Sequence, residues 1–320
     1  YAPFLFWVTW VLAAWVTVVL LFDEMDEVLA HWPIALAMLV GSYVAGSTPM
    51  GGGTVGFPIL VLLFDQPASL GRNFSFCIQA VGMSSAAIFI LCSGRPLAGR
   101  MLVWAALGSA VSLPLAYEWL VPHVQDTVVK LLFACVWAGF GIMTLVKLKA
   151  LLHEHHVPRL GATADAWIGL GVGLIGGVVA SLTGVGIDMI AYSVLVLLYR
   201  CDLRLAIGTS VILMAWNSLL GVVVATAHGD LDPEVAHHWL AAAPVVLFGA
   251  PLGALMVQVI SRAKTLVVVS ILCLGQLVWT LVNVRADLLT LGIVGSSVLA
   301  LNGVFHLLYA TGGRLVRRRS

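Results

Sequence analysis

Long apolar segments follow one another along this chain and limit it to one class of fold. Most have about the 20 residues that a helix needs to cross the hydrocarbon core of a bilayer, and they contain few charges. Because lipid offers the backbone no hydrogen-bond partner, such segments must be helical, and we predict an all-α polytopic membrane protein. The predicted segments cover residues 4–22, 34–64, 73–92, 97–120, 125–147, 165–199, 204–227, 235–260, 264–283 and 287–311.

Composition and charge exclude several other classes of protein. With 61% hydrophobic and 10% charged residues, the chain is too apolar for a soluble domain of its length. A net charge of +1 indicates no nucleic-acid partner. The G-x-G-x-x-G pattern at 171–176 lies within an apolar segment without a preceding strand, so it is not a nucleotide-binding motif. His153 and His156 of "HEHH" are attributed to a solvated loop. We therefore predict no cofactor, no metal site and no catalytic residue.

Two of the apolar segments are interrupted where a spanning helix should be continuous. The sequence "GSTPMGGGTVGFP" at 46–58 contains five glycines and two prolines, which disfavour a helix interior. Helices over residues 34–47 and 54–64 would be about 21 and 16 Å long at 1.5 Å per residue, shorter than the roughly 30 Å core. We predict a re-entrant hairpin with its turn at 48–53, and segment 165–199 repeats the pattern with a turn at 183–188.

The positions of Lys and Arg orient these segments in the membrane. The basic tail at 312–320 is assigned to the cytoplasm, and counting back places the basic joint at 147–164 on the same side. The acidic segment 23–31 then falls outside, and Arg72 is the one charge that disagrees. This agreement requires both interrupted segments to be hairpins. The expected location is the cell inner (cytoplasmic) membrane, as a multi-pass protein with a cytoplasmic C-terminus.

The two halves of the chain resemble each other at an offset of 135 residues, which places Thr48 over Thr183 and Ser75 over Ser210. Each unit would be a hairpin plus three spanning helices, an odd number of crossings, so we predict inverted-topology repeats. Chance or simple helix-packing symmetry is the alternative. The predicted parts are a transmembrane helix at 1–22, repeat 1 at 34–147, a cytoplasmic linker at 148–164, repeat 2 at 165–283, a transmembrane helix at 287–311 and a basic tail at 312–320.

Three motifs carry a resemblance to a known family. The sequences "GFPILVLL" at 56–63, "TGVGIDMIAYSVLVLL" at 183–198 and "LAIGTS" at 205–210 resemble the TauE/SafE family of anion exporters. The resemblance covers about 41–86 and 176–221. It implies export of sulfite or of an organosulfonate such as sulfoacetate.

The family's glycine cluster is present in the first half but altered in the second. It stands here as Gly51, Gly52 and Gly53, whereas Ile187 and Asp188 replace glycines in the second half. These departures bear on the identity of the substrate more than on the fold.

Each turn is expected to expose the N-terminus of the short helix that follows it, and these two ends form the predicted anion site. The first N–H groups of a helix lack intrahelical partners and carry a partial positive charge, and glycine lets an oxyanion approach them. The alternative is that the glycines only allow close helix packing. The predicted substrate-binding residues are Thr48, Pro49, Gly51, Gly52, Gly53, Asn73, Ser75, Gln79, Thr183, Gly184, Gly186, Thr209, Ser210 and Asn217.

Two polar residues of this set, Ser75 and Gln79, lie four positions apart and therefore share one helical face. They could donate hydrogen bonds to one ligand, or bond to other helices or to the carbonyls of their own helix. Asp188 is the charge placed deepest in the predicted membrane region, where an ionisable residue suggests function. It is interpreted as a proton-coupling group or a cation ligand, with an N-cap of a helix beginning at 189 as the alternative.

These features together predict a secondary transporter that exports a small sulfur-containing anion by alternating access. A passive anion channel and an uptake carrier for an oxyanion such as thiosulfate remain alternatives. An intramembrane enzyme is disfavoured, because Asp188 stands alone at depth without a second catalytic group. The expected partners are the small anionic substrate and the lipid bilayer, and a homodimer is also considered.

Overall fold

The computed structural model describes residues 1–48, 50–153, 161–256 and 262–317. This part of the chain is all-helical, and nine of its helices are long and apolar enough to cross a membrane. The structure therefore confirms the predicted class of a polytopic helical membrane protein. Pro49, a predicted site residue, and His156 lie outside the described residues.

The helices follow the predicted segments closely. In chain order they are α1 (Ala2–Leu21), α2 (Met25–Ala30), α3 (Trp32–Ser47), α4 (Gly53–Pro58), η1 (Ile59–Leu63), α5 (Ala68–Cys92), α6 (Gly99–Trp119), η2 (Val121–His123), α7 (Asp126–His153), α8 (Ala162–Thr183), α9 (Ile187–Ser193), η3 (Val194–Leu198), α10 (Leu203–His228), α11 (Pro233–Met256), α12 (Arg262–Asn283) and α13 (Leu288–Arg317).

Both interrupted segments are broken helices whose short arm folds back along the longer one. A Cβ placed on Gly41 of α3 would lie 3.0 Å from Val55 Cβ of α4, so the missing side chain lets the two arms approach. In the second half, a Cβ on Gly176 of α8 would lie 2.4 Å from Ile187 Cγ1 of α9. Each short arm then continues into a π-helical turn, η1 or η3. Small residues thus position both turns inside the bundle.

Helices from the two halves interlock rather than form separate bundles. The π-helices η1 and η3 begin at Ile59 and Val194, 135 positions apart, and α5 and α10 begin at Ala68 and Leu203 with the same spacing. Helix α6 of the first half packs along α8 of the second, and α11 of the second packs along α3 of the first. Each broken helix is therefore held by a helix from the other half.

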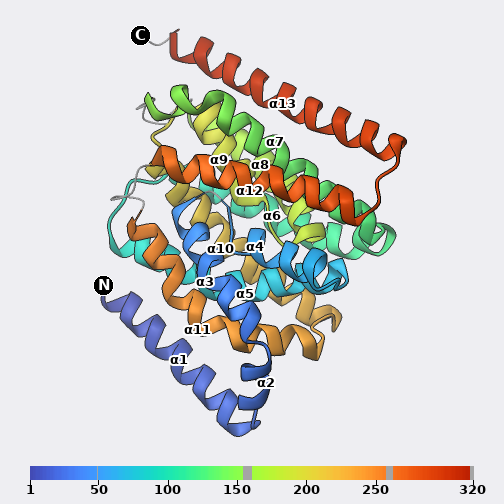
Figure 1. Ribbon diagram of the computed structural model, residues 1–320. Coiled ribbons are helices and arrows are strands. Elements are labelled where there is room, and N and C mark those ends of the chain that lie inside the picture. The colour runs from blue at the N-terminus through green and yellow to red at the C-terminus, as the bar shows by residue number, and fades with distance from the viewer. Residues whose placement is uncertain (49, 154–160, 257–261, 318–320) are drawn as a thin grey trace.

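Helices α1 and α13 lie at opposite edges of the molecule (Figure 1), outside the interlocked helices. Most of their apolar side chains are exposed, as expected of surfaces that face lipid. Three features differ from the expected segments. The acidic stretch before α3 contains the short helix α2. Helix α7 continues to His153 and α13 to Arg317, each six residues past its expected end, at residues 147 and 311.

Candidate functional site

The two turns meet in the interior of the protein. A Cβ on Gly53 would lie 2.5 Å from Val185 Cγ1 of the second turn and 2.6 Å from Ser75 Cβ of α5. A Cβ on Gly184 would lie 2.7 Å from the same Ser75 Cβ. Ser75 of α5 therefore sits between the two turns, and the glycines allow the three backbones to approach so closely.

Gln79 lies one helical turn beyond Ser75 and links α5 to the second turn. Its Nε2 donates hydrogen bonds to the carbonyl oxygens of Ser75, at 2.9 Å, and of Gly184, at 3.2 Å. Its Oε1 is buried and has no hydrogen-bond partner among the described residues. The predicted shared face of Ser75 and Gln79 is present, but the Ser75 hydroxyl donates to the Gly71 carbonyl of its own helix.

Asp188 lies in the first turn of α9, fully buried, beside Gly51 of the other turn. Its Oδ1 accepts a hydrogen bond from the Met189 N–H at 2.9 Å, whereas Oδ2 has no partner among the described residues. A Cβ on Gly51 would lie 1.8 Å from Gln79 Oε1 and 3.3 Å from Asp188 Oδ2. Two buried oxygens without partners thus flank one glycine, and such groups in a folded protein call for an explanation such as a ligand, an ion or water.

The alternative interpretation of Asp188 from the sequence is that it forms the N-cap of a helix beginning at residue 189. The structure begins α9 at Ile187 and makes Gly186 its N-cap, so Asp188 is an internal residue of the first helical turn. A carboxylate there interacts favourably with the helix dipole. Its charge also stands where a bound anion would need the same N–H groups.

Two threonines and two glycines shape the ends of the long arms. The Thr48 hydroxyl donates to the Val44 carbonyl at 2.7 Å, and Thr183 Oγ1 lies 2.9 Å from the Val185 carbonyl oxygen. Gly184 has φ +77° and Gly186 φ +112°, in the region that favours glycine. These four predicted residues define the turn conformation, and both hydroxyls donate to backbone carbonyls.

Three of the remaining predicted residues form hydrogen bonds with segments other than the two turns. Asn73 Nδ2 donates to the Asp230 carbonyl at 2.8 Å, and the Thr209 hydroxyl accepts from the Ala98 N–H at 3.1 Å. The Ser210 hydroxyl donates to the Ile207 carbonyl of its own helix. Asn217 is fully buried, and neither atom of its amide group has a hydrogen-bond partner among the described residues.

An aromatic stack that the sequence analysis missed connects the two hairpins. Phe57 of α4 stacks on Phe133 of α7 at 4.6 Å between ring centroids, and Phe133 stacks on Trp137 at 4.0 Å. The Trp137 ring in turn borders Gly186, with its Cζ3 and Cη2 atoms within 4 Å of a Cβ placed there. The spacing of Phe133 and Trp137, four positions apart on a predicted helix, was the available signal.

Arg72, the charge that disagreed with the predicted orientation, is buried beside the second turn and belongs to a network that reaches the exposed Asp230. Its Nη2 donates to Tyr117 Oη at 3.0 Å and lies 3.7 Å from Asp230 Oδ2. Tyr117 donates to the same carboxylate at 2.8 Å. Because Asp230 pairs with it, Arg72 is not an isolated positive charge, and its backbone carbonyl lies against Gly184.

The space beside the first turn is small in this conformation. A cavity of about 10 Å³ borders Gly52, Gln79 and Met38. This is about the volume that one water molecule requires, so this cavity does not admit an anion in this conformation.

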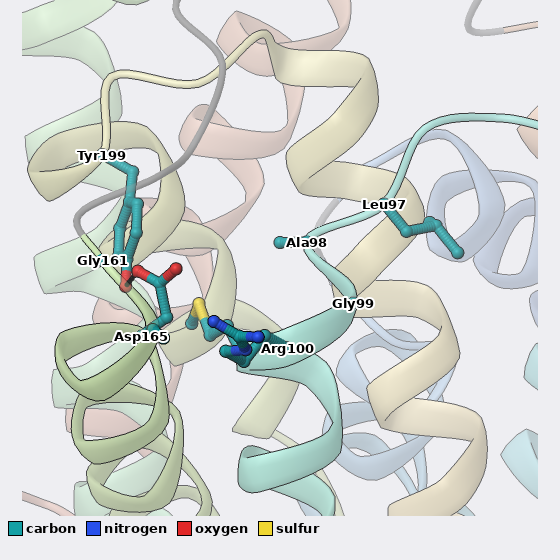
Figure 2. Close-up of a pocket in the computed structure, with 9 residues that line it drawn as sticks. Leu97, Ala98, Gly99, Arg100, Gly161, Asp165 and Tyr199 are labelled. Atoms are coloured by element: carbon teal, nitrogen blue, oxygen red, sulfur yellow. Dashed lines mark hydrogen bonds between the residues drawn. The ribbon is translucent and has the colours of Figure 1, made fainter.

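A larger pocket opens elsewhere, where the loop before α6 meets the start of α8. It has a volume of about 470 Å³ and is lined by Leu97, Ala98, Gly99, Arg100, Met101, Gly161, Ala162, Asp165 and Tyr199. Figure 2 shows Arg100 on one side and Asp165 with Tyr199 on the other. The Tyr199 hydroxyl donates to Asp165 Oδ1 at 2.9 Å. The Thr209 hydroxyl holds the Ala98 end of this loop.

A comparison with known protein families matches a part of the chain that includes both turns. The sequence model of a family described as sulfite exporter TauE/SafE matches residues 34–280. No match to a curated protein or to a solved structure was found. The matched residues include both broken helices and every residue at the junction of the turns.

Proposed function

This chain belongs to the sulfite exporter TauE/SafE family, and we propose that it is a secondary transporter which exports sulfite or an organosulfonate such as sulfoacetate. The family is one of membrane transporters of sulfur anions, and the nine apolar helices make the chain a multi-pass membrane protein. Alternating access to the junction of the two turns is the proposed mechanism.

The observation that carries this proposal is the meeting of two broken helices in a buried position. The N-termini of α4 and α9 follow the two turns, and the turns touch through Gly53 and Val185. Helix N-termini bind anions through their free N–H groups and their positive dipole ends. Broken helices from two halves of a transporter are where substrate sites commonly lie. A site built from partial charges also holds an anion loosely enough to release it.

The small cavity beside the first turn supports a carrier rather than an open passive channel. A channel in its conducting state needs a continuous path, whereas a cavity of about 10 Å³ beside Gly52 admits no oxyanion. A carrier passes through closed states as its halves rock against each other. Helix α3 packs along α11, and α6 packs along α8. The two halves could move against each other at these two contact surfaces.

The pocket at Arg100 is the proposed entrance on the cytoplasmic side. The guanidinium of Arg100 offers a charge that attracts an anion, and Asp165 faces it across the pocket. The positive-inside rule assigns this loop, with its Arg95 and Arg100, to the cytoplasm. We propose with it that the protein lies in the cell inner membrane with its C-terminus in the cytoplasm, and that its two repeats have inverted orientation.

Transport by the purified protein in liposomes tests this function directly. We expect uptake of radiolabelled sulfite to saturate with concentration and to accelerate when the opposite compartment contains unlabelled sulfite. The reason is that a carrier must return its binding site to the first side of the membrane before it can transport again. Sulfoacetate, thiosulfate, sulfate and taurine, added as competitors, rank the substrates. Linear, unsaturable flux without acceleration would instead identify a channel, and the absence of any sulfur-anion flux would refute the proposal.

We propose that Asp188 links proton movement to anion movement. Its ionised form repels an anion at the α9 N-terminus, and its protonated form does not. Asp188→Asn resembles the protonated form at every pH, so the variant should transport at alkaline pH as the wild type does at acidic pH. Transport rates measured in liposomes across a pH series check this.

Asp287→Asn is the matched control for this variant. Asp287 is an exposed carboxylate that caps α13 by accepting from the Thr290 N–H, far along the chain from both turns. It should keep the wild-type pH profile. An unchanged profile in Asp188→Asn would show that this carboxylate does not couple protons.

A further inference from the structure

A cluster of three histidines and three glutamates lies where α2 and the residues on either side of it meet the start of α11. It consists of Glu24, Glu27, His31, Glu234, His237 and His238, and helix α2 packs against α11. Its two halves lie about 200 positions apart in the sequence, so no spacing pattern indicated it. Because the turns of the transport site involve other residues, the cluster is a separate feature.

We propose that His31, His238 and Glu234 bind one divalent transition-metal ion of the Zn²⁺ type. His31 Nε2 lies 3.5 Å and His238 Nε2 lies 3.4 Å from the same oxygen, Glu234 Oε1. All three ligand atoms lie within 4.8 Å of one another. Ligands about 2.0–2.1 Å from a tetrahedral Zn²⁺ stand roughly 3.3–3.4 Å apart, so the observed separations suit a shared ion.

The hydrogen bond of His31 leaves the correct nitrogen available. His31 Nδ1 lies 2.8 Å from the Glu27 backbone carbonyl, which can only accept, so Nδ1 carries the proton. The lone pair of the neutral ring is then on Nε2, the atom that faces Glu234. Metal-binding histidines typically have this second hydrogen bond to a carbonyl or carboxylate.

His238 gives independent support for a ligand. Its side chain is only 7% exposed, and neither ring nitrogen has a hydrogen-bond partner in the described part of the chain. Its ring meets His31 edge-on at 4.6 Å between centroids, so Nε2 is held beside Glu234. A buried imidazole without partners is unfavourable unless another group occupies its lone pair.

The charges around the cluster also favour a cation. Within the described residues, every ion pair of Glu24, Glu27 and Glu234 is with a histidine. With neutral imidazoles, the three carboxylates leave a net negative charge. Two imidazoles and one carboxylate form a ligand set that Zn²⁺ accepts, with a fourth position for water. The ion would join the segment before α3 to the start of α11. Helices α3 and α11 pack along each other, so the ion would link one end of this pair.

Zinc binding to the full-length, tag-free protein in detergent tests the site. After chelator treatment, we expect the wild type to bind one Zn²⁺ tightly, measured by competition with a chromophoric chelator. His238→Ala and Glu234→Gln should each weaken this binding by more than the roughly 10–100-fold that follows loss of a group which only orients a ligand. Glu234→Gln keeps the side-chain volume at a partly exposed position, so it provides the answer if His238→Ala fails to fold.

Two controls separate this site from other histidines. His228→Ala removes an imidazole whose ion pair, within the described residues, is with Glu118, and a triple variant replaces His153, His155 and His156 by alanine. Both should keep the tight site. Zn²⁺ should also raise the unfolding temperature of the wild type but not of Glu234→Gln. Failure of the wild type to bind Zn²⁺ above the level of Glu234→Gln would overturn the proposal, as would loss of the site in the triple variant alone.

Discussion

Gly52→Val is expected to abolish anion transport while the protein remains folded. Gly52 has φ −56° and ψ −30°, a conformation that valine adopts without strain. A Cβ there would meet only side chains, with the Met38 methyl nearest at 3.3 Å. The valine would fit against this flexible side chain, but its methyl groups would fill the cavity beside the first turn and cover the backbone N–H groups.

The expected loss is large because the proposed contacts are charge-assisted. A hydrogen bond to a charged group contributes about 1.5–3 kcal/mol, so removing one weakens anion binding by roughly tenfold to more than a hundredfold. Sulfite counterflow in liposomes and the thermal unfolding midpoint in detergent should be measured on the same preparation. Gly52→Ala, with one carbon added, should fall between the wild type and Gly52→Val.

Gly171→Val is the matched control, because it adds the same side chain to a helix glycine with no atom within 4 Å of its Cβ position. Gly171 lies in the middle of α8, so this variant should transport like the wild type. If Gly52→Val also transported normally, the anion would have to bind elsewhere and the proposed site would be wrong.

Gly184→Ala is expected to destabilise the fold strongly. Gly184 has φ +77°, and a left-handed conformation costs a non-glycine residue about 1–2 kcal/mol. Its added Cβ would also lie 2.5 Å from the Arg72 carbonyl oxygen, a backbone atom that cannot rotate away. Such overpacking costs about 1–3 kcal/mol more. The unfolding midpoint on heating or on titration with SDS should therefore fall sharply.

Gly229→Ala separates the two causes. Gly229 also ends a helix, with φ +72°, but no atom lies within 4 Å of its Cβ position. Its substitution should therefore show only the cost of the left-handed backbone and a smaller fall in the midpoint. Equal effects of the two variants would mean that the contact between the second turn and α5 contributes nothing to stability.

The sequence was informative about the junction of the turns where a local rule connects residues. The spacing of Ser75 and Gln79 correctly places them on one face of α5, and glycine content locates both helix breaks to within a few residues. The predicted set of site residues also included Asn73, two positions from Ser75. The side chain of Asn73 points instead to Asp230. A helix turns by about 100° per residue, so a neighbour in sequence need not face the same ligand.

Contacts between distant segments were not predictable in this way. Nothing in the sequence indicated that Gly51 would lie between Gln79 and Asp188, or that the loop before α6 would bind Thr209. The stack of Phe57 on Phe133 and the cluster of His31 with His238 also join elements far apart in the chain. Each depends on how whole helices cross, which side-chain periodicity does not encode.

The sequence by itself determined the class of fold, because long apolar segments in lipid can satisfy their backbone only as helices. It also determined where two of those helices must break, because glycine and proline act on the residues next to them. That the two breaks form one site was also a prediction from the sequence, but only the tertiary structure decided which side chains lie between them. The physical reason is range: backbone conformation depends on neighbouring residues, whereas the packing of α4 and α9 around Ser75 depends on close fit among helices from both halves.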